Sequence, residues 1–207
     1  MRINRLLMSL VLLATSAVPQ QSVPPPPDPA AGTGSLESTM KFIQDQLNAV
    51  GKVNYATHWH DYVDETDGVA QYSFEQSHVT ADPASCWIRF HVKIVAGTAL
   101  NDRDNGFFLP DVQDVVVTTG EQYANKHYIA SGYPSISAKV DPSIFWLVTQ
   151  RPGNYSQASV WRRAGEDAFV FTDQETASRV AKAMRHAVEL CGGGPKSTET
   201  TRNGAEK

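Results

Sequence analysis

The sequence of 207 residues has few cysteines and no excess of basic charge. Its 18 Lys and Arg side chains stand against 22 Asp and Glu, and the formal net charge is −4. Because binding to nucleic-acid phosphates needs clustered Lys and Arg, this balance argues against a nucleic-acid-binding protein. With 41% hydrophobic and 19% charged residues, the composition is typical of a globular protein.

Common catalytic motifs are also missing from the sequence. It contains no G-x-S-x-G elbow, no H-E-x-x-H pair and no phosphate-binding P-loop. We therefore expect no cofactor, and we expect binding rather than catalysis.

The first 21 residues have the order of a secretory signal peptide. Arg2 and Arg5 give a positive start, residues 6–14 are apolar and residues 15–17 are small. This apolar run is too short to span a membrane and no later run is longer, so we expect no membrane insertion after cleavage. A buried N-terminal helix is the alternative. Without residues 1–21, which hold two Arg and no acid, 16 basic side chains face 22 acidic ones and the charge is −6.

Two polar segments flank one predicted domain. Residues 22–34 are rich in proline and predict a semi-rigid linker, whereas residues 192–207 are rich in Gly, Thr and charge and predict a disordered tail. Residues 35–191 are enough for a single globular domain with one core.

Hydrophobic periodicity predicts a helix at each end of this domain and strands between them. Ser35 can cap a helix over 36–50, and a capping box from Thr172 to Glu175 begins a second helix that ends near Cys191. Residues 97–106 predict a turn, and residues 120–142 a long loop with at most one short element. Seven strands are expected, at about 53–60, 69–79, 86–94, 112–119, 144–149, 156–162 and 168–171.

The two cysteines predict a disulfide. Cys86 begins a predicted inward-facing strand, and Cys191 ends the apolar face of the last helix. An exported protein can keep such a bond, which would hold that helix across the sheet. Two separate buried thiols or a catalytic thiol are the alternatives.

Three segments resemble exported bacterial proteins with a pleckstrin-homology-like domain: MKFIQDQLNAVGKVNY, ADPASCWIRFHV and VAKAMRHAVELCGG. From the first segment to the last they span residues 40–192, which is most of the chain that follows the predicted signal peptide. The resemblance implies an α+β fold, a small seven-stranded antiparallel barrel or orthogonal sandwich with a flanking N-terminal helix and a closing C-terminal helix. It implies no functional residues. Phosphoinositide-binding members of the wider fold need basic residues around the first hairpin, and the segment 61–68 has four acids and no base, so we expect no phosphoinositide binding.

Three histidines are candidate metal ligands. His58 and His60 share one side of a predicted strand, and His91 lies on the outward side of another. Neutral imidazoles so placed can bind a metal ion, which would make the protein a metal-dependent enzyme. A solvated polar face is the alternative, because two histidines two residues apart are an incomplete ligand motif.

Tryptophans suggest another hypothesis, that the protein is a carbohydrate-binding module. Strand parity turns Trp87 and Trp161 outward, where exposed rings beside polar groups can stack on sugars. The alternative is that Trp59, Trp146 and the other two cover edges of the core.

The leading hypothesis is a non-catalytic binding or protein-interaction module of the bacterial cell envelope. We expect it to capture a peptide or protein in a groove or at a strand edge. The expected contact surfaces are the segment 120–142 and the open face near Trp87, Arg89 and His91.

Overall fold

The computed structural model describes residues 34–152 and 165–195. The predicted signal peptide, most of the linker, the strand expected at 156–162 with Trp161, and the tail from residue 196 lie outside the described residues. In chain order the elements are α1 (Leu36–Val50), β1 (Lys52–Asp61), β2 (Thr66–Asp82), β3 (Trp87–Ala96), β4 (Ala99–Phe108), the short 3-10 helix η2 (Leu109–Asp111), β5 (Asp114–Thr119), α2 (Gly120–Ala130), β6 (Ile136–Val140), β7 (Phe145–Gln150), β8 (Glu166–Phe171) and α3 (Gln174–Leu190).

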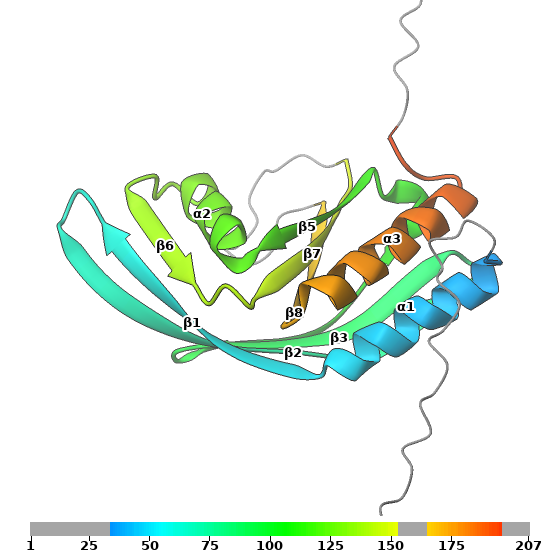
Figure 1. The fold of residues 1–207 in the computed structure, drawn as a ribbon, viewed down its shortest axis with the longest axis horizontal. Helices are drawn as coiled ribbons and strands as arrows, with labels where there is room; N and C mark the ends of the chain where they lie inside the picture. The colour runs from blue at the N-terminus through cyan, green and yellow to red at the C-terminus, as the bar shows by residue number, and fades with distance from the viewer. Residues whose placement is uncertain (1–33, 153–164, 196–207) are drawn as a thin grey trace, which may run out of the picture.

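The described strands form two antiparallel sheets. Five strands pair in the order β4-β3-β2-β1-β6, and three pair in the order β5-β7-β8. Figure 1 shows the long strands β1 and β2 curving along one side of the molecule, with α2 and the three-stranded sheet opposite them. The α+β class is confirmed. The closed seven-stranded barrel is wrong for this part of the chain, because β4 and β6 are free ends of the larger sheet and α2 interrupts the expected run of strands.

Helix α1 forms where its sequence predicted it. The Ser35 side chain accepts a hydrogen bond from the Ser38 amide at the N-cap, and Gly51 follows the last turn with a φ of 63°, which favours glycine. Met40, Ile43 and Leu47 are fully buried on one face. This face packs on β2 and α3, so α1 is part of the core rather than an added flank.

Helix α3 lies antiparallel beside α1 (Figure 1). Its N-cap is Asp173, whose carboxylate accepts from the amides of Glu175 and Thr176, so the capping box expected at Thr172 is wrong. The predicted apolar stripe is confirmed. Its buried residues are Ala177, Val180, Ala181, Ala183, Met184, Ala187 and Val188. The four alanines let the helix approach its neighbours closely.

The disulfide between Cys86 and Cys191 is present, with 6.1 Å between the two Cα atoms. It links the turn before β3 to the C-cap of α3, across 105 residues of sequence. Beyond it, the Gly194 amide donates to the Val112 carbonyl at 2.8 Å, so the first residues of the expected tail are packed against the domain.

Two segments expected to be irregular are regular. Residues 99–108 form β4, which pairs along its whole length with β3, so the chain turns only at Gly97 and Thr98. The segment 120–142 contains α2 and β6 instead of a long loop. A capping box between Thr119 and Gln122 begins α2.

Side chains from helices cover several open strand edges. Strand β1 begins opposite Glu75, so β2 has no strand neighbour on that side beyond this residue. There Asn48 of α1 both donates to the Val79 carbonyl and accepts from the Val79 amide, each at 2.9 Å. Asn125 of α2 makes the same pair of bonds with Ala138 of β6, at 3.0 and 2.8 Å. Covered edges cannot pair with another chain.

No helix in the described ranges has the length and apolarity needed to cross a membrane.

Removing the disulfide should destabilise the fold. The double substitution Cys86→Ala with Cys191→Ala frees a loop on the order of 100 residues in the unfolded chain, and we expect a loss of about 2–5 kcal/mol. Urea unfolding of the oxidised wild type and of the variant measures this difference. Equal stability of the two proteins would contradict the expectation.

Removing the Asn48 side-chain amide should also destabilise the fold. Asn48→Leu leaves the buried Val79 amide and carbonyl without partners, which we expect to cost about 2–4 kcal/mol of unfolding free energy. The matched control is Asn54→Leu, at an exposed position of β1, which should change stability by less than about 0.5 kcal/mol. A similar effect of both substitutions in urea unfolding would show that the edge contact contributes nothing particular.

Candidate ligand-binding cavity

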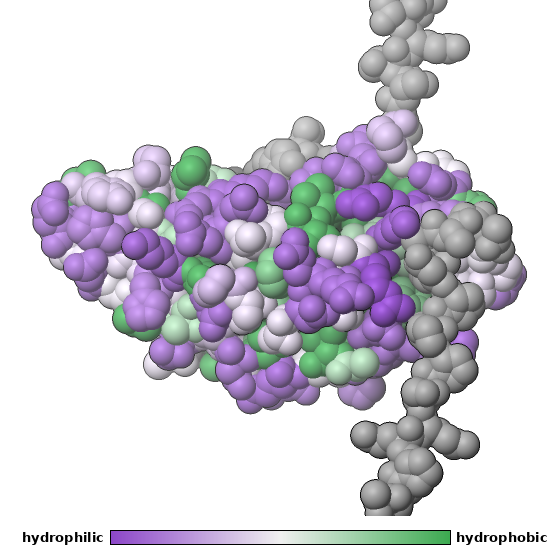
Figure 2. Space-filling view, viewed as in Figure 1, coloured by the Kyte–Doolittle hydropathy of each residue, from purple (hydrophilic) through white to green (hydrophobic). Residues whose placement is uncertain are grey.

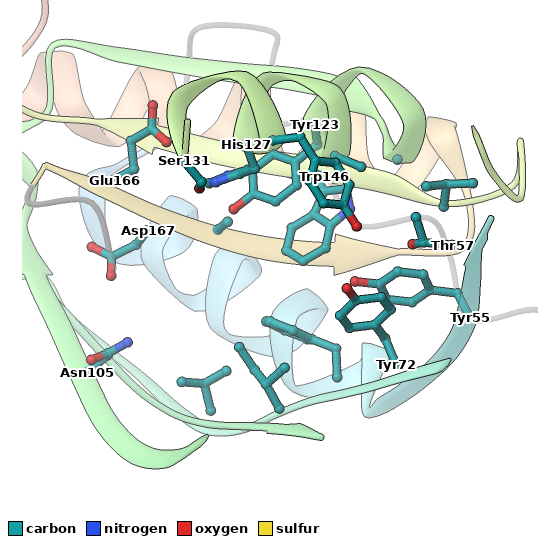
Figure 3. A pocket seen from close by; sticks show the side chains of 18 of the residues that line it. Tyr55, Thr57, Tyr72, Asn105, Tyr123, His127, Ser131, Trp146, Glu166 and Asp167 are labelled. Atoms are coloured by element: carbon teal, nitrogen blue, oxygen red, sulfur yellow. The ribbon is translucent and has the colours of Figure 1, made fainter. Parts of the chain in front are cut away.

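A cavity of about 170 Å³ lies between the five-stranded sheet and the elements opposite it. One wall comes from inward-facing residues of the five-stranded sheet, β1 to β4 and β6, and the other comes from α2, β7 and β8. Figure 3 shows Tyr55 and Tyr72 rising from the curved sheet toward Trp146 and Tyr123. The cavity is therefore built by parts of the chain that are far apart in sequence.

Aromatic rings form a large part of the cavity wall, and Trp146 is central among them. Its indole stacks on Tyr123 of α2, with 4.1 Å between ring centroids and 11° between planes. The edges of Tyr55 and Phe74 meet the same indole at 6.3 and 5.4 Å between centroids. Tyr55 also stacks on Tyr72 at 5.2 Å. Such stacked and edge contacts suit the quadrupoles of aromatic rings.

The tyrosine hydroxyls at this wall stay protonated. Burial raises the pKa of Tyr55, and it raises the pKa of Tyr72 to about 12. The neighbouring Tyr128 contributes to this raised pKa of Tyr72, through charge repulsion and a hydrogen bond. At neutral pH the cavity therefore offers neutral phenols rather than phenolates.

Charged side chains gather at the opposite end of the cavity, where Figure 3 shows Glu166 and Asp167. The Oε1 atom of Glu166 pairs with Lys126 Nζ at 2.9 Å, and the Glu166 side chain is only 7% exposed. Its Oε2 atom is buried without a hydrogen-bond partner among the residues described. Asp167 Oδ2 pairs with Arg151 Nη2 at 2.6 Å. One carboxylate oxygen at this end thus still has its accepting capacity.

The turn between α2 and β6 borders the cavity. Tyr133 in this turn lines the cavity and is 56% exposed. On the face shown in Figure 2, apolar side chains form small separate patches among polar ones. This face therefore carries no broad apolar patch in the part that the figure shows.

The three candidate metal ligands do not come together. Along β2, the residue opposite His60 is Asp67 and the residue opposite His91 is Ser77. These two partners are ten residues apart, roughly 33 Å along a strand, which separates His91 from both His58 and His60. The three histidines therefore cannot share an ion. No group of three or more potential metal-ligating side chains occurs within residues 34–152 and 165–195.

Trp87, Arg89 and His91 lie on the sheet face opposite the cavity. Their neighbours in sequence, Phe90 and Val92, line the cavity, so strand alternation turns these three side chains away from it. The Arg89 guanidinium lies over the Trp87 ring at 5.7 Å. These three side chains thus do not line the cavity described above.

None of the described tryptophans has a fully exposed ring on which a sugar could stack. Trp146 is 5% exposed, and Trp59 and Trp87 are half-buried. The Trp59 ring lies over Gly68, opposite it on β2, and the Trp87 ring lies against Gly106 on β4; a Cβ atom at either glycine would collide with the indole. These contacts weaken the carbohydrate hypothesis and favour the alternative that the rings cover edges of the structure.

His91 is held by two carboxylates of β4. Its Nδ1 lies 2.9 Å from Asp104 Oδ1, and its Nε2 lies 3.0 Å from Asp102 Oδ1. Lys93 Nζ also reaches Asp102, at 3.7 Å, and the His78 ring lies 6.1 Å from that of His91. The hydrogen bond with Asp104 is the largest cause that raises the pKa of His91, and the charges of both carboxylates add to it.

Sequence reasoning missed the cavity, although it placed some of its residues correctly. It expected strands at about 53–60 and 69–79, and these strands carry Tyr55, Tyr72 and Phe74. The available signal was the presence of two tyrosines in adjacent predicted strands. A buried tyrosine hydroxyl usually needs a hydrogen-bond partner, so such residues can mark a polar site in the interior. Trp146 lay in an expected strand, and Tyr123 lay in the segment expected to be a loop.

Fold and site define an α+β protein with an aromatic cavity between two antiparallel sheets. No protein-family model, curated protein or solved structure matches the chain.

The His91 contacts should make stability depend on pH. Because the folded-state pKa of His91 is raised, its ion pairs stabilise the fold fully below about pH 6.5, and this contribution is lost as the pH rises through the folded-state pKa. We expect Asp104→Asn to lower the pKa of His91 in an NMR titration. It should also destabilise the protein at pH 5.5 more than at pH 8.5 in urea unfolding.

The control for this prediction is Asp111→Asn, which removes an exposed carboxylate from η2. It should leave the titration of His91 in place. An unchanged His91 titration in Asp104→Asn would contradict the assignment.

Proposed function

We propose that this protein is a non-catalytic binding module of the bacterial cell envelope that takes a small aromatic or apolar molecule into the cavity beside Trp146. The observation that carries the proposal is a preformed cavity with an aromatic wall and a few polar groups at one end. Sites of this composition are typical of small-molecule binding. The volume of about 170 Å³ suits a single ring, since apolar cavities of about 150 Å³ take up benzene.

Two observations support the envelope part of the proposal. The disulfide between Cys86 and Cys191 is compatible with an oxidising compartment, and the first 21 residues have the pattern of a signal peptide. The resemblance to exported proteins with a pleckstrin-homology-like domain agrees with this location. That classification stays a prediction, and ligand binding in the cavity does not depend on it.

Peptide capture at the edge of β4 is the second candidate. Among the described strands β4 pairs only with β3, so its outer edge has no strand neighbour. This edge lies next to His91 and Trp87, where the sequence predicted a contact surface. The charged side chains of Asp102, Arg103 and Asp104 oppose unspecific strand addition there, so a captured peptide would have to match them.

Filling the cavity should abolish ligand binding. Ala124 of α2 lines the cavity, and Ala124→Phe places a benzyl group in it. Isothermal titration calorimetry with a panel of single-ring molecules (toluene, p-cresol and 4-methylanisole) should show binding to the wild type and at least tenfold weaker binding to the variant.

The matched control is Ala49→Phe, which adds the same group at an exposed helical position, in α1 and outside the cavity. It should bind the panel like the wild type. If no member of the panel binds the wild type, or if Ala124→Phe binds as well as the control, the proposed function is wrong.

A further inference from the structure

Resting on the proposed function, we propose that the cavity recognises a single-ring molecule that carries a carbonyl oxygen. The hydroxyl groups of Thr57 and Tyr55 donate hydrogen bonds to this oxygen. The ring of the ligand occupies the apolar space of the cavity beside them.

Thr57 has a buried polar side chain that faces the cavity. The residue is 3% exposed and lines the cavity, and its hydroxyl makes no hydrogen bond with any residue in the described ranges. By contrast, the buried side chains of Gln76 and Thr149 donate to backbone carbonyls, at 3.2 and 3.3 Å. Unlike the hydroxyl of Thr39, that of Thr57 is not fully enclosed by protein atoms, so a molecule in the cavity can reach it. A buried hydroxyl without a partner is costly, and an acceptor on a ligand removes this cost.

The sheet fixes the position of Thr57. The residue lies on the strand between β2 and β6, opposite Ala70 on one side and Val140 on the other. Threonine is branched at Cβ, which restricts the rotation of its side chain. The hydroxyl is therefore held in place before a ligand arrives, and little conformational entropy is lost when its hydrogen bond forms.

Tyr55 supplies a second hydroxyl on the same side of β1. It lies two residues before Thr57, so strand alternation turns both side chains toward the cavity, which both of them line. Figure 3 shows the two side chains projecting from this strand into the interior. Burial raises the pKa of Tyr55, so at neutral pH its hydroxyl keeps the proton that it donates. Among the described residues, this hydroxyl also has no hydrogen-bond partner.

Two hydroxyl donors that line one cavity favour a ligand oxygen that accepts. A carbonyl oxygen has two lone pairs and takes one hydrogen bond from each hydroxyl. The indole N–H of Trp146, which can only donate, likewise has no acceptor in the part of the chain that the structure describes. A ligand without an acceptor leaves these donors unsatisfied.

The first test compares acetophenone with α-methylstyrene, in which a methylene group replaces the carbonyl oxygen and the shape is kept. Calorimetric titration measures the affinity of both for the wild type and for Thr57→Val, which exchanges the hydroxyl for a methyl group of similar size. Thr57→Val should weaken the binding of acetophenone about three- to tenfold, the value of one neutral hydrogen bond. Its affinity for α-methylstyrene should not fall, because that ligand has no acceptor.

The outcomes of this test separate the inference from the proposed function. An equal change for both ligands in Thr57→Val would overturn the inference while leaving the cavity as a binding site. If neither ligand binds the wild type, the proposed function fails. Ala124→Phe, which fills the cavity, should lose both ligands.

Matched variants test the second hydroxyl and supply the controls. Tyr55→Phe should weaken the binding of acetophenone and spare that of α-methylstyrene. Thr80→Val and Tyr62→Phe remove the same groups at exposed positions outside the cavity and should bind both ligands like the wild type. Because the Thr57 hydroxyl has no partner to lose, Thr57→Val should not lower the midpoint of urea unfolding of the free protein. A lowered midpoint would overturn the inference.

Infrared difference spectroscopy with isotope-labelled acetophenone measures the hydrogen bond to the carbonyl directly. The carbonyl stretch of the bound ligand should lie at a lower wavenumber than in hexane, and Thr57→Val should move it upward. A stretch that equals the value in hexane would overturn the inference, and this comparison needs only the wild type. A lowered stretch that Thr57→Val leaves unchanged would also overturn it, because another donor would then hold the carbonyl.

Discussion

The packing of Trp146 holds the two halves of the structure at their observed separation. This one indole stacks on Tyr123 of α2 and meets the edges of Tyr55 and Phe74 from the five-stranded sheet. Large rings in edge and stacked contact are stiff and cannot collapse onto one another as aliphatic side chains do. The space beside Trp146 therefore remains open, and the cavity follows from the same contacts that join the sheets.

An open arrangement of two sheets exposes more strand edges than a closed barrel does. Here the adjacent helices cover several of them: Asn48 bonds Val79 on β2, and Asn125 bonds Ala138 on β6. Arg185 of α3 likewise donates two hydrogen bonds to a carbonyl of β5. Each amide or guanidinium satisfies backbone groups that would otherwise be free to pair with a second chain. These three strands therefore have no long unpaired edge, although the two sheets do not close into a barrel.

The differences between predicted and observed elements have local causes. Strand β4 has the sequence ALNDRDNGFF, whose Asn, Asp and Gly are typical of turns, and it becomes a strand because it pairs with β3. Cross-strand contacts from His91 to Asp102 and Asp104 turn its acidic side chains into favourable partners. Helix α2 has no clear apolar stripe, and its only strong local signal is the capping box between Thr119 and Gln122. Tertiary contacts outweighed weak local preference in both segments.

The sequence by itself determined the helices α1 and α3, the inward face of β3, and the pairing of the only two cysteines. Each of these depends on local periodicity or on the absence of another partner. The order of strands in each sheet, the opposition of Trp146 to the curved sheet and the burial of Glu166 were decided only by the tertiary structure. These features join residues far apart along the chain, and the shape of a cavity depends on how far packing lets those residues approach each other.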